Sequence, residues 1–121
     1  MELLQKKNIV YELLDTFKSA GNVALDLRTK GLKQQIKEDN TPVTNGDIEV
    51  NNILTKKISE LTPSIPIVSE ETSENKKNTN LNNFWLIDPI DGTNDYINNR
   101  EEFTLNAALI LDKIPAIGII Y

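Results

Sequence analysis

The sequence contains no histidine and no cysteine. Without cysteine the chain can form neither disulfides nor thiolate nucleophiles. Without histidine it lacks the most common general base, the serine triad and the typical zinc sites. Any catalysis by this chain must therefore depend on carboxylates, hydroxyls, lysines and a bound metal ion.

Positive charge and long hydrophobic runs are also scarce. The 13 Lys and Arg residues face 18 Asp and Glu residues, which gives a net charge of −5. No basic stripe appears, so we expect no nucleic-acid partner, and an acidic chain that acts on a phosphate needs cations between the two. The charged first fifteen residues contain no signal-peptide core, and no run approaches membrane-spanning length. We expect a cytoplasmic protein without membrane insertion.

The apolar residues that are present recur at helical spacing in two stretches. A chain of 121 residues can form one domain with its own core. The first stretch predicts a helix over residues 2–28, with Gly31 as its C-terminal cap. Thr44-Asn45-Gly46-Asp47 has the spacing of a helix N-cap, and it predicts a second helix that ends before Pro63. Capping alone would explain Asp47 from this local pattern.

Short apolar runs elsewhere predict strands. We expect a layered α/β fold in which two N-terminal helices pack on one face of a mainly antiparallel sheet. Residues 72–83 are polar and predict a surface loop. The apolar run 117–121 ends the sequence without a polar cap, which predicts a fragment. The predicted strands are 32–38, 65–69, the apolar run from Trp85 up to Asp88, 103–111 and 115–121, the last two as an antiparallel hairpin.

Trp85-Leu86-Ile87-Asp88-Pro89-Ile90-Asp91-Gly92-Thr93 is the segment that carries chemistry. It predicts a buried strand that breaks at Asp88-Pro89, followed by a second carboxylate, a glycine able to adopt unusual angles and the start of a helix. Carboxylates bind hard divalent cations, and N–H groups at a helix start bind phosphate. The spacing does not fit an EF-hand. A plain turn uses the same residue types, so the metal-assisted phosphate site is one of two interpretations.

Three further segments make the pattern more specific. They are Lys37 to Asp47, Pro66 to Glu71 and Glu102 to Ile110. Together with the motif Trp-x-Ile-Asp-Pro-Ile-Asp-Gly-Thr, these segments resemble the inositol monophosphatase superfamily of lithium-sensitive, magnesium-dependent phosphomonoesterases. Within it, the segment from Glu102 to Ile110, followed by Pro115 and Gly118, resembles one branch in particular, the bacterial 3′(2′),5′-bisphosphate nucleotidases. Ser69 before the two acids and the absence of histidine depart from the inositol monophosphatase pattern.

The resemblance implies a set of metal ligands. Glu70, Asp88, Asp91 and the carbonyl of Ile90 would bind two or more Mg²⁺ ions, with water and phosphate as further ligands. Glu71 is then expected to be a solvated neighbour, because side chains alternate along a strand.

The resemblance also implies catalytic and substrate-binding roles. Asp47 and Thr93 would orient and deprotonate the attacking water, which gives Asp47 a second role beside capping. Gly92 and Thr93 would offer N–H groups to the phosphate. Glu70 and Asp91 would face the substrate as well, and Lys37 would add positive charge near it.

The implied reaction is magnesium-dependent hydrolysis of the 3′-phosphate of adenosine 3′,5′-bisphosphate to AMP and phosphate by a metal-activated water. The alternatives are an inositol- or sugar-phosphate monoesterase, and a half-domain that binds metal and phosphate without turnover. The family has a further metal-binding aspartate in a Trp-Asp segment that this sequence lacks. We therefore expect residues 1–121 to be the N-terminal portion of a phosphatase domain, with little or no activity alone.

Overall fold

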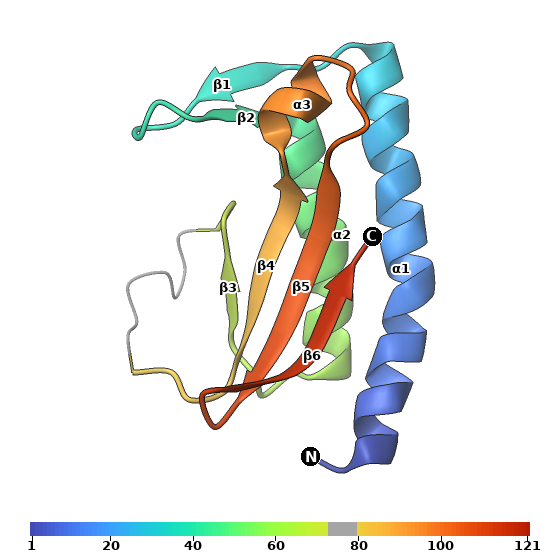
Figure 1. The fold of residues 1–121 in the computed structure, drawn as a ribbon, viewed down its shortest axis with the longest axis vertical. Helices are drawn as coiled ribbons and strands as arrows, with labels where there is room; N and C mark the ends of the chain where they lie inside the picture. The colour runs from blue at the N-terminus through green and yellow to red at the C-terminus, as the bar shows by residue number, and fades with distance from the viewer. Residues whose placement is uncertain (73–79) are drawn as a thin grey trace.

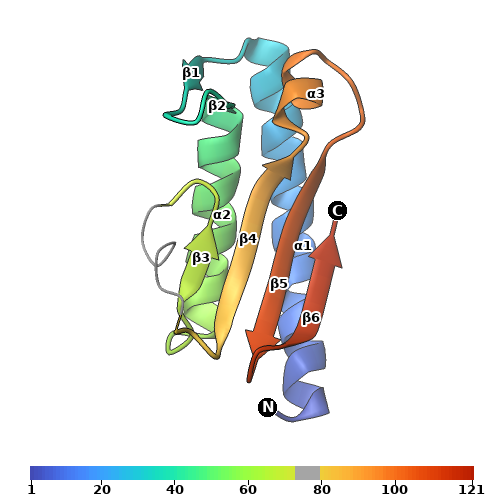
Figure 2. The ribbon, with the colours of Figure 1, turned by 60° about the vertical axis from the view of Figure 1, so that its left-hand side comes forward.

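A four-stranded sheet forms the centre of the fold, and two long helices cover one of its faces (Figures 1 and 2). The structure is a computed structural model that describes residues 1–72 and 80–121. In chain order the elements are α1 (Leu3–Lys30), β1 (Gln34–Ile36), β2 (Pro42–Thr44), α2 (Asn45–Leu61), β3 (Ile67–Ser69), β4 (Phe84–Asp91), α3 (Thr93–Ile97), β5 (Thr104–Leu111) and β6 (Ile114–Ile120).

The strand order of the sheet is β3-β4-β5-β6. β3 runs parallel to β4, and the other two pairs are antiparallel. β1 and β2 form a separate two-stranded antiparallel ladder beyond the end of the sheet (Figure 1). The predicted architecture, two helices on one face of a mainly antiparallel sheet, is confirmed.

The core lies between the helices and the inner face of the sheet. Alternate residues of each strand point to this face, as the period of two requires. The indole N–H of Trp85 donates to Thr62 Oγ1 at 3.0 Å, so the one polar group of this fully buried ring is satisfied. The largest buried apolar side chains are Trp85, Tyr96, Phe17, Leu13, Leu54, Ile58, Ile87, Leu105 and Leu109.

Both long helices have the ends that the sequence predicted. Gly31 caps α1 with a φ of 101°, a conformation that favours glycine. Thr44 caps α2: its hydroxyl accepts a bond from the N–H of Asp47, whose carboxylate accepts one from the N–H of Thr44. This reciprocal arrangement is the capping box that the spacing indicated. Among the described residues, no helix combines the length and the apolar character needed to cross a bilayer.

Two predicted strands are shorter in the structure. β1 covers residues 34–36 rather than 32–38, and β3 covers 67–69 rather than 65–69. Pro66 precedes β3 and has no N–H to donate, although its carbonyl accepts a bond from the N–H of Trp85 at 2.9 Å. Of the loop predicted over 72–83, residues 73–79 lie outside the described part of the chain.

The predicted break at Asp88-Pro89 is wrong: β4 continues to Asp91 through a β-bulge. Asp88 pairs with Asn106, whereas Asp91 pairs with Thr104, so β4 takes three steps where β5 takes two. The extra residue lies at Pro89-Ile90, and proline is tolerated at a bulge because it has no N–H to contribute to the ladder. The strand therefore carries both carboxylates itself.

The side chain of Tyr96, on α3, packs against both α1 and α2. Its ring is fully buried, and its hydroxyl donates to the carbonyl of Ala24 in α1 at 2.6 Å. The guanidinium of Arg28 lies 5.5 Å from the ring centroid, and Phe103 packs edge-on at 5.0 Å. Burial raises the pKa of Tyr96 to about 12, so the hydroxyl stays protonated and keeps donating.

Gly46, in the first turn of α2, leaves room for this ring. A Cβ at this position would overlap the Tyr96 hydroxyl and lie 2.8 Å from Cζ. We expect Gly46→Ala to lower the free energy of unfolding by about 1–3 kcal/mol, the usual effect of overpacking a core. Gly118→Ala is the matched control, because a Cβ there has no neighbour within 4 Å. Equal stability of the two variants in urea unfolding would contradict a tight contact between Gly46 and the Tyr96 ring.

Candidate functional site

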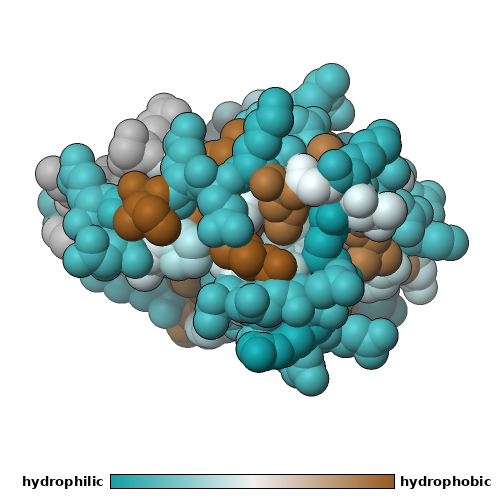
Figure 3. All heavy atoms as spheres, turned by 90° about the horizontal axis from the view of Figure 1, so that it is seen from above, coloured by the Kyte–Doolittle hydropathy of each residue, from teal (hydrophilic) through white to brown (hydrophobic). Residues whose placement is uncertain are grey.

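The candidate site lies where the ends of β3 and β4 meet the starts of α2 and α3 (Figure 2). This is the end of the molecule on which β1, β2 and α3 sit (Figure 1). Seen from above, hydrophilic side chains cover most of this end, with a few hydrophobic ones between them (Figure 3). The polar character fits a site for a charged ligand.

Asp47 is the fully buried carboxylate of this region. Its Oδ2 accepts from the N–H of Thr44 at 2.9 Å and from the Thr44 hydroxyl at 2.6 Å. Its Oδ1 accepts from the hydroxyl of Thr93 at 2.9 Å. A buried charge needs such bonds to offset its desolvation, and here both oxygens have partners.

Thr93 is the first residue of α3, and its hydroxyl connects two predicted site residues. Oγ1 lies 2.9 Å from Asp47 Oδ1 and 3.2 Å from the carbonyl oxygen of Ile90. A hydroxyl has one proton, so these two acceptors compete for it. The lone pairs of Oγ1 remain able to accept a bond from a water or a ligand.

Gly92 makes the turn from β4 into α3. Its φ of 89° lies in the left-handed region, as the sequence predicted. A Cβ here would also lie 2.7 Å from the carbonyl oxygen of Glu102. Any side chain at this position would be disfavoured both by the backbone strain of a positive φ and by the nearby carbonyl oxygen of Glu102. The turn that this glycine permits sets the position of Thr93.

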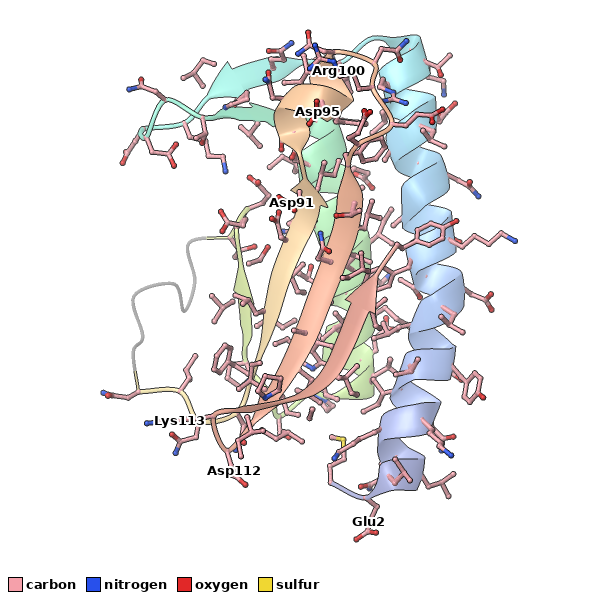
Figure 4. All side chains as sticks on the ribbon, in the orientation of Figure 1. Glu2, Asp91, Asp95, Arg100, Asp112 and Lys113 are labelled. Carbon is pink, nitrogen blue, oxygen red and sulfur yellow. The ribbon has the colours of Figure 1, made fainter. Side chains whose placement is uncertain are left out.

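The bulge decides where Asp88 and Asp91 point. Residues three apart in a regular strand face opposite sides of a sheet, but one extra residue restores both to the same side. Their partners Asn106 and Thr104 share the outer face, where Asn106 Nδ2 donates to Thr104 Oγ1 at 3.0 Å. Asp91 is exposed, at the end of β4 below α3 (Figure 4).

The charges around Asp88 identify its neighbours. Partial burial, followed by the negative charges of Asp91, Glu70, Glu71 and Asp47, raises the pKa of Asp88 from 3.8 to about 6. Carboxylates from three separate segments thus act on one another electrostatically.

Glu70 and Glu71 occupy the middle of a tight turn after β3. The N–H of Thr72 donates to the carbonyl of Ser69 at 3.3 Å, and the N–H of Glu70 donates to the carbonyl of Ile87 at 3.1 Å. Glu70 is exposed. The expectation that Glu71 is the solvated neighbour is wrong, because alternation along a strand does not extend into a turn.

Glu71 instead pairs with a predicted substrate-binding residue. Its side chain is only 7% exposed, and Oε1 lies 3.3 Å from Lys37 Nζ. The ion pair brings the ammonium of Lys37 from the β1–β2 connection to the edge of the carboxylate group. Lys37 is therefore close to the site, engaged by an acid.

The oxygen donors match the preference of Mg²⁺ in kind. Within residues 1–72 and 80–121, however, no group of three or more acidic side chains is arranged so that it could hold a metal ion. The four acids that raise the pKa of Asp88 are neighbours without forming a closed cage. A cation at this place would have to take part of its coordination from water or from a bound anion.

Two buried polar residues of this region were not predicted. Asn51 lies on α2 one turn after Asp47, and Ser69 ends β3. Asn51 donates to the Thr72 hydroxyl at 3.0 Å and accepts from the Ser69 hydroxyl. The sequence did hold a signal for Asn51. It occupies a position on the apolar face of α2, and a polar residue on that face is expected to be buried.

Comparison with known proteins agrees with this arrangement. The family model described as "Inositol monophosphatase family" matches residues 6–121 of the chain. The chain belongs to this family. It is 40% identical to the 3′(2′),5′-bisphosphate nucleotidase CysQ of Buchnera aphidicola, over 94% of this chain and 46% of that protein. It is 35% identical to the CysQ of Aggregatibacter actinomycetemcomitans, over 94% of this chain and 43% of that protein.

Solved structures of family members share the fold. An IMPase/NADP phosphatase complexed with Mg²⁺ and phosphate superposes with a TM-score of 0.82 at 24% identity, over 95% of this chain and 44% of that one. The extragenic suppressor protein suhB of Bartonella henselae gives 0.82 at 20% identity, over 94% and 45%. The chain thus spans a little under half the length of the relatives and structures that it matches.

The raised pKa of Asp88 makes the stability of the metal-free protein depend on pH. A proton on Asp88 stabilises the fold fully below the ordinary pKa of 3.8, and this contribution is lost as the pH rises through about 6. We expect Asp88→Asn to raise the melting temperature at pH 7.5 by about 2–5 °C, a value discounted for partial exposure.

At pH 4 the gain from Asp88→Asn should vanish, because the wild-type carboxyl is then largely protonated. Asp112→Asn, in the exposed β5–β6 turn, is the matched control and should leave the pH profile unchanged. Calorimetric scans with EDTA at both pH values measure the difference. A gain of equal size at pH 4 and pH 7.5 would contradict the electrostatic explanation.

Proposed function

We propose that this chain forms the metal- and phosphate-binding portion of a magnesium-dependent phosphomonoesterase. The observation that carries the proposal is the hydrogen bond of 2.9 Å between Thr93 and buried Asp47, beside the bulge that turns Asp88 and Asp91 to one face. A proton acceptor and a set of anionic oxygen donors thus lie together at a polar end of the fold. This combination suits attack of water on a phosphate.

The Thr93 hydroxyl and Asp47 supply the proton path. A water that donates to Thr93 Oγ1 passes its proton to this oxygen as the hydroxyl proton moves to Asp47 Oδ1. The water oxygen then bonds to phosphorus while the bond from phosphorus to the ester oxygen breaks, and the leaving ester oxygen takes a proton from solvent water. The two bonds from Thr44 hold the other oxygen of Asp47 in place during this transfer.

Asp88, Asp91, Glu70 and the carbonyl of Ile90 are the residues that would hold Mg²⁺. When bound, the cation neutralises phosphate charge and helps to position the reactants. A related IMPase/NADP phosphatase has been solved as a complex with Mg²⁺ and phosphate, and this supports the assignment. Within the chain, the exposure of Glu70 and Asp91 leaves their carboxylates accessible to a cation.

The N–H groups of Gly92 and Thr93 and the ammonium of Lys37 would contact the phosphate oxygens. The left-handed turn at Gly92 fixes the first two. Lys37 can exchange its partner Glu71 for phosphate, or remain paired and add charge from the edge of the site.

The favoured substrate is adenosine 3′,5′-bisphosphate, hydrolysed at its 3′-phosphate to AMP. The bisphosphate nucleotidases of Buchnera and Aggregatibacter, at 40% and 35% identity, support this choice. An inositol phosphate is the second candidate, because solved members of the same fold include inositol monophosphatases. Binding without turnover is the third possible behaviour of these 121 residues.

Phosphate release from the two substrates with Mg²⁺ tests the proposal. We expect faster phosphate release from adenosine 3′,5′-bisphosphate than from inositol 1-phosphate. Residues 1–121 are assayed first, and if they show no turnover the same comparison is made with the proposed complete domain. Calorimetry on the same sample separates binding from turnover. Absence of both Mg²⁺ binding and phosphate release would overturn the proposal.

Variants at Thr93 test the proton path. We expect Thr93→Val to lower kcat by about 10²–10⁴-fold, because it removes the hydroxyl between water and Asp47. Thr93→Ser retains a hydroxyl and should recover much of the rate. Thr29→Val, an exposed threonine on α1, is the control for the change of side chain. Equal rates for the Val and Ser variants would show that the hydroxyl has no such role.

A further inference from the structure

Asn51 is a buried polar residue to which the proposed reaction assigns no role. It is 6% exposed and lies four residues after Asp47 in α2. Residues four apart share one face of a helix, about 6 Å from each other. Two polar side chains on the buried face of one helix thus reach toward the same end of the molecule.

The amide of Asn51 holds both ends of the turn that carries Glu70 and Glu71. Its Oδ1 accepts from the Ser69 hydroxyl at 2.5 Å, and its Nδ2 donates to the Thr72 hydroxyl at 3.0 Å. Ser69 and Thr72 are the first and last residues of that turn. One side chain therefore spans the turn from beneath.

Ser69 continues the connection into the turn itself. Its hydroxyl is buried, at 1% exposure of the residue, and it accepts from the N–H of Glu71 at 3.3 Å. Loss of the Asn51 amide would leave the Ser69 hydroxyl without its acceptor in a buried place, which is unfavourable. The turn would relax to recover that bond and would carry the two acids with it.

We propose that Asn51 is a positioning residue that fixes the Glu70–Glu71 turn relative to the Asp47–Thr93 pair. Asp47 bonds to Thr93 and Asn51 bonds to the turn, and both arise from one rigid stretch of α2. The helix thereby sets the distance between the proton acceptor and the acids after β3. The consequence for catalysis rests on the proposed function, whereas the effect on the turn does not.

Hydrogen exchange tests the effect on the turn without metal or substrate. We expect Asn51→Ala to speed exchange at the amides of Glu71 and Thr72 by about tenfold or more, because each donates to a group of Ser69. Amides of α2 beyond Leu54 should keep their protection. Asn51→Leu keeps a branched side chain of similar shape without the amide, so it avoids the cavity that alanine would leave, and it should speed exchange at the same two amides.

Titration with Mn²⁺ by calorimetry gives the second readout. Residues that orient metal ligands typically change metal affinity by about 10–100-fold, and we expect a Kd increase in that range for both Asn51 variants. In the complete domain the Mg²⁺ concentration for half-maximal phosphate release should rise by a similar factor, with a smaller fall in kcat. The effects of Ser69→Ala and Asn51→Ala should be less than additive, since both variants lose the bond between the two residues.

Asn52→Ala, on the exposed side of the same helix, is the matched control. If Asn51→Ala and Asn52→Ala give the same exchange and the same Mn²⁺ affinity, the inference is wrong. If exchange at the turn rises but the wild-type protein binds no Mn²⁺ and releases no phosphate, the positioning role stands and the proposed function fails.

Discussion

The buried carboxylate of Asp47 is the constraint on which the rest of the site depends. It accepts bonds from the backbone and hydroxyl of Thr44 and from the hydroxyl of Thr93. The first two close the N-terminus of α2, and the third ties α3 to it. Without these bonds a buried charge would be strongly destabilising, so the fold and the site share the same interaction. Capping uses Oδ2 of Asp47, and the proposed catalytic role uses Oδ1.

α2 also contacts the other parts of the site. Gly46 admits the Tyr96 ring, which locks α3 onto α1, and Asn51 holds the turn after β3. On the opposite side, the bulge in β4 turns Asp88 and Asp91 to one face. Partial burial raises the pKa of Asp88, and the negative charges of the neighbouring acids raise it further. A cation bound here, as proposed, would relieve the repulsion between these acids.

The sequence predicted what local chemistry controls. The Thr44–Asp47 spacing, the helical periodicity and the positive φ of Gly92 all follow from neighbours in the chain, and the structure has each of them. The bulge could not be placed, because strand register depends on β5, although a proline inside an apolar run was a signal for it. The burial of Glu71 was missed because its partner Lys37 is 34 residues away. The metal-ligand and catalytic roles stay predictions from family resemblance.

Anomalous diffraction from crystals grown with Mn²⁺ and phosphate would locate the cation and the anion relative to these residues. We expect manganese peaks beside the carboxylates of Asp88 and Asp91, with the Glu70 carboxylate in contact with the same ions and phosphate next to Thr93. Peaks confined to other surface acids, or phosphate bound away from Thr93, would contradict the proposed site.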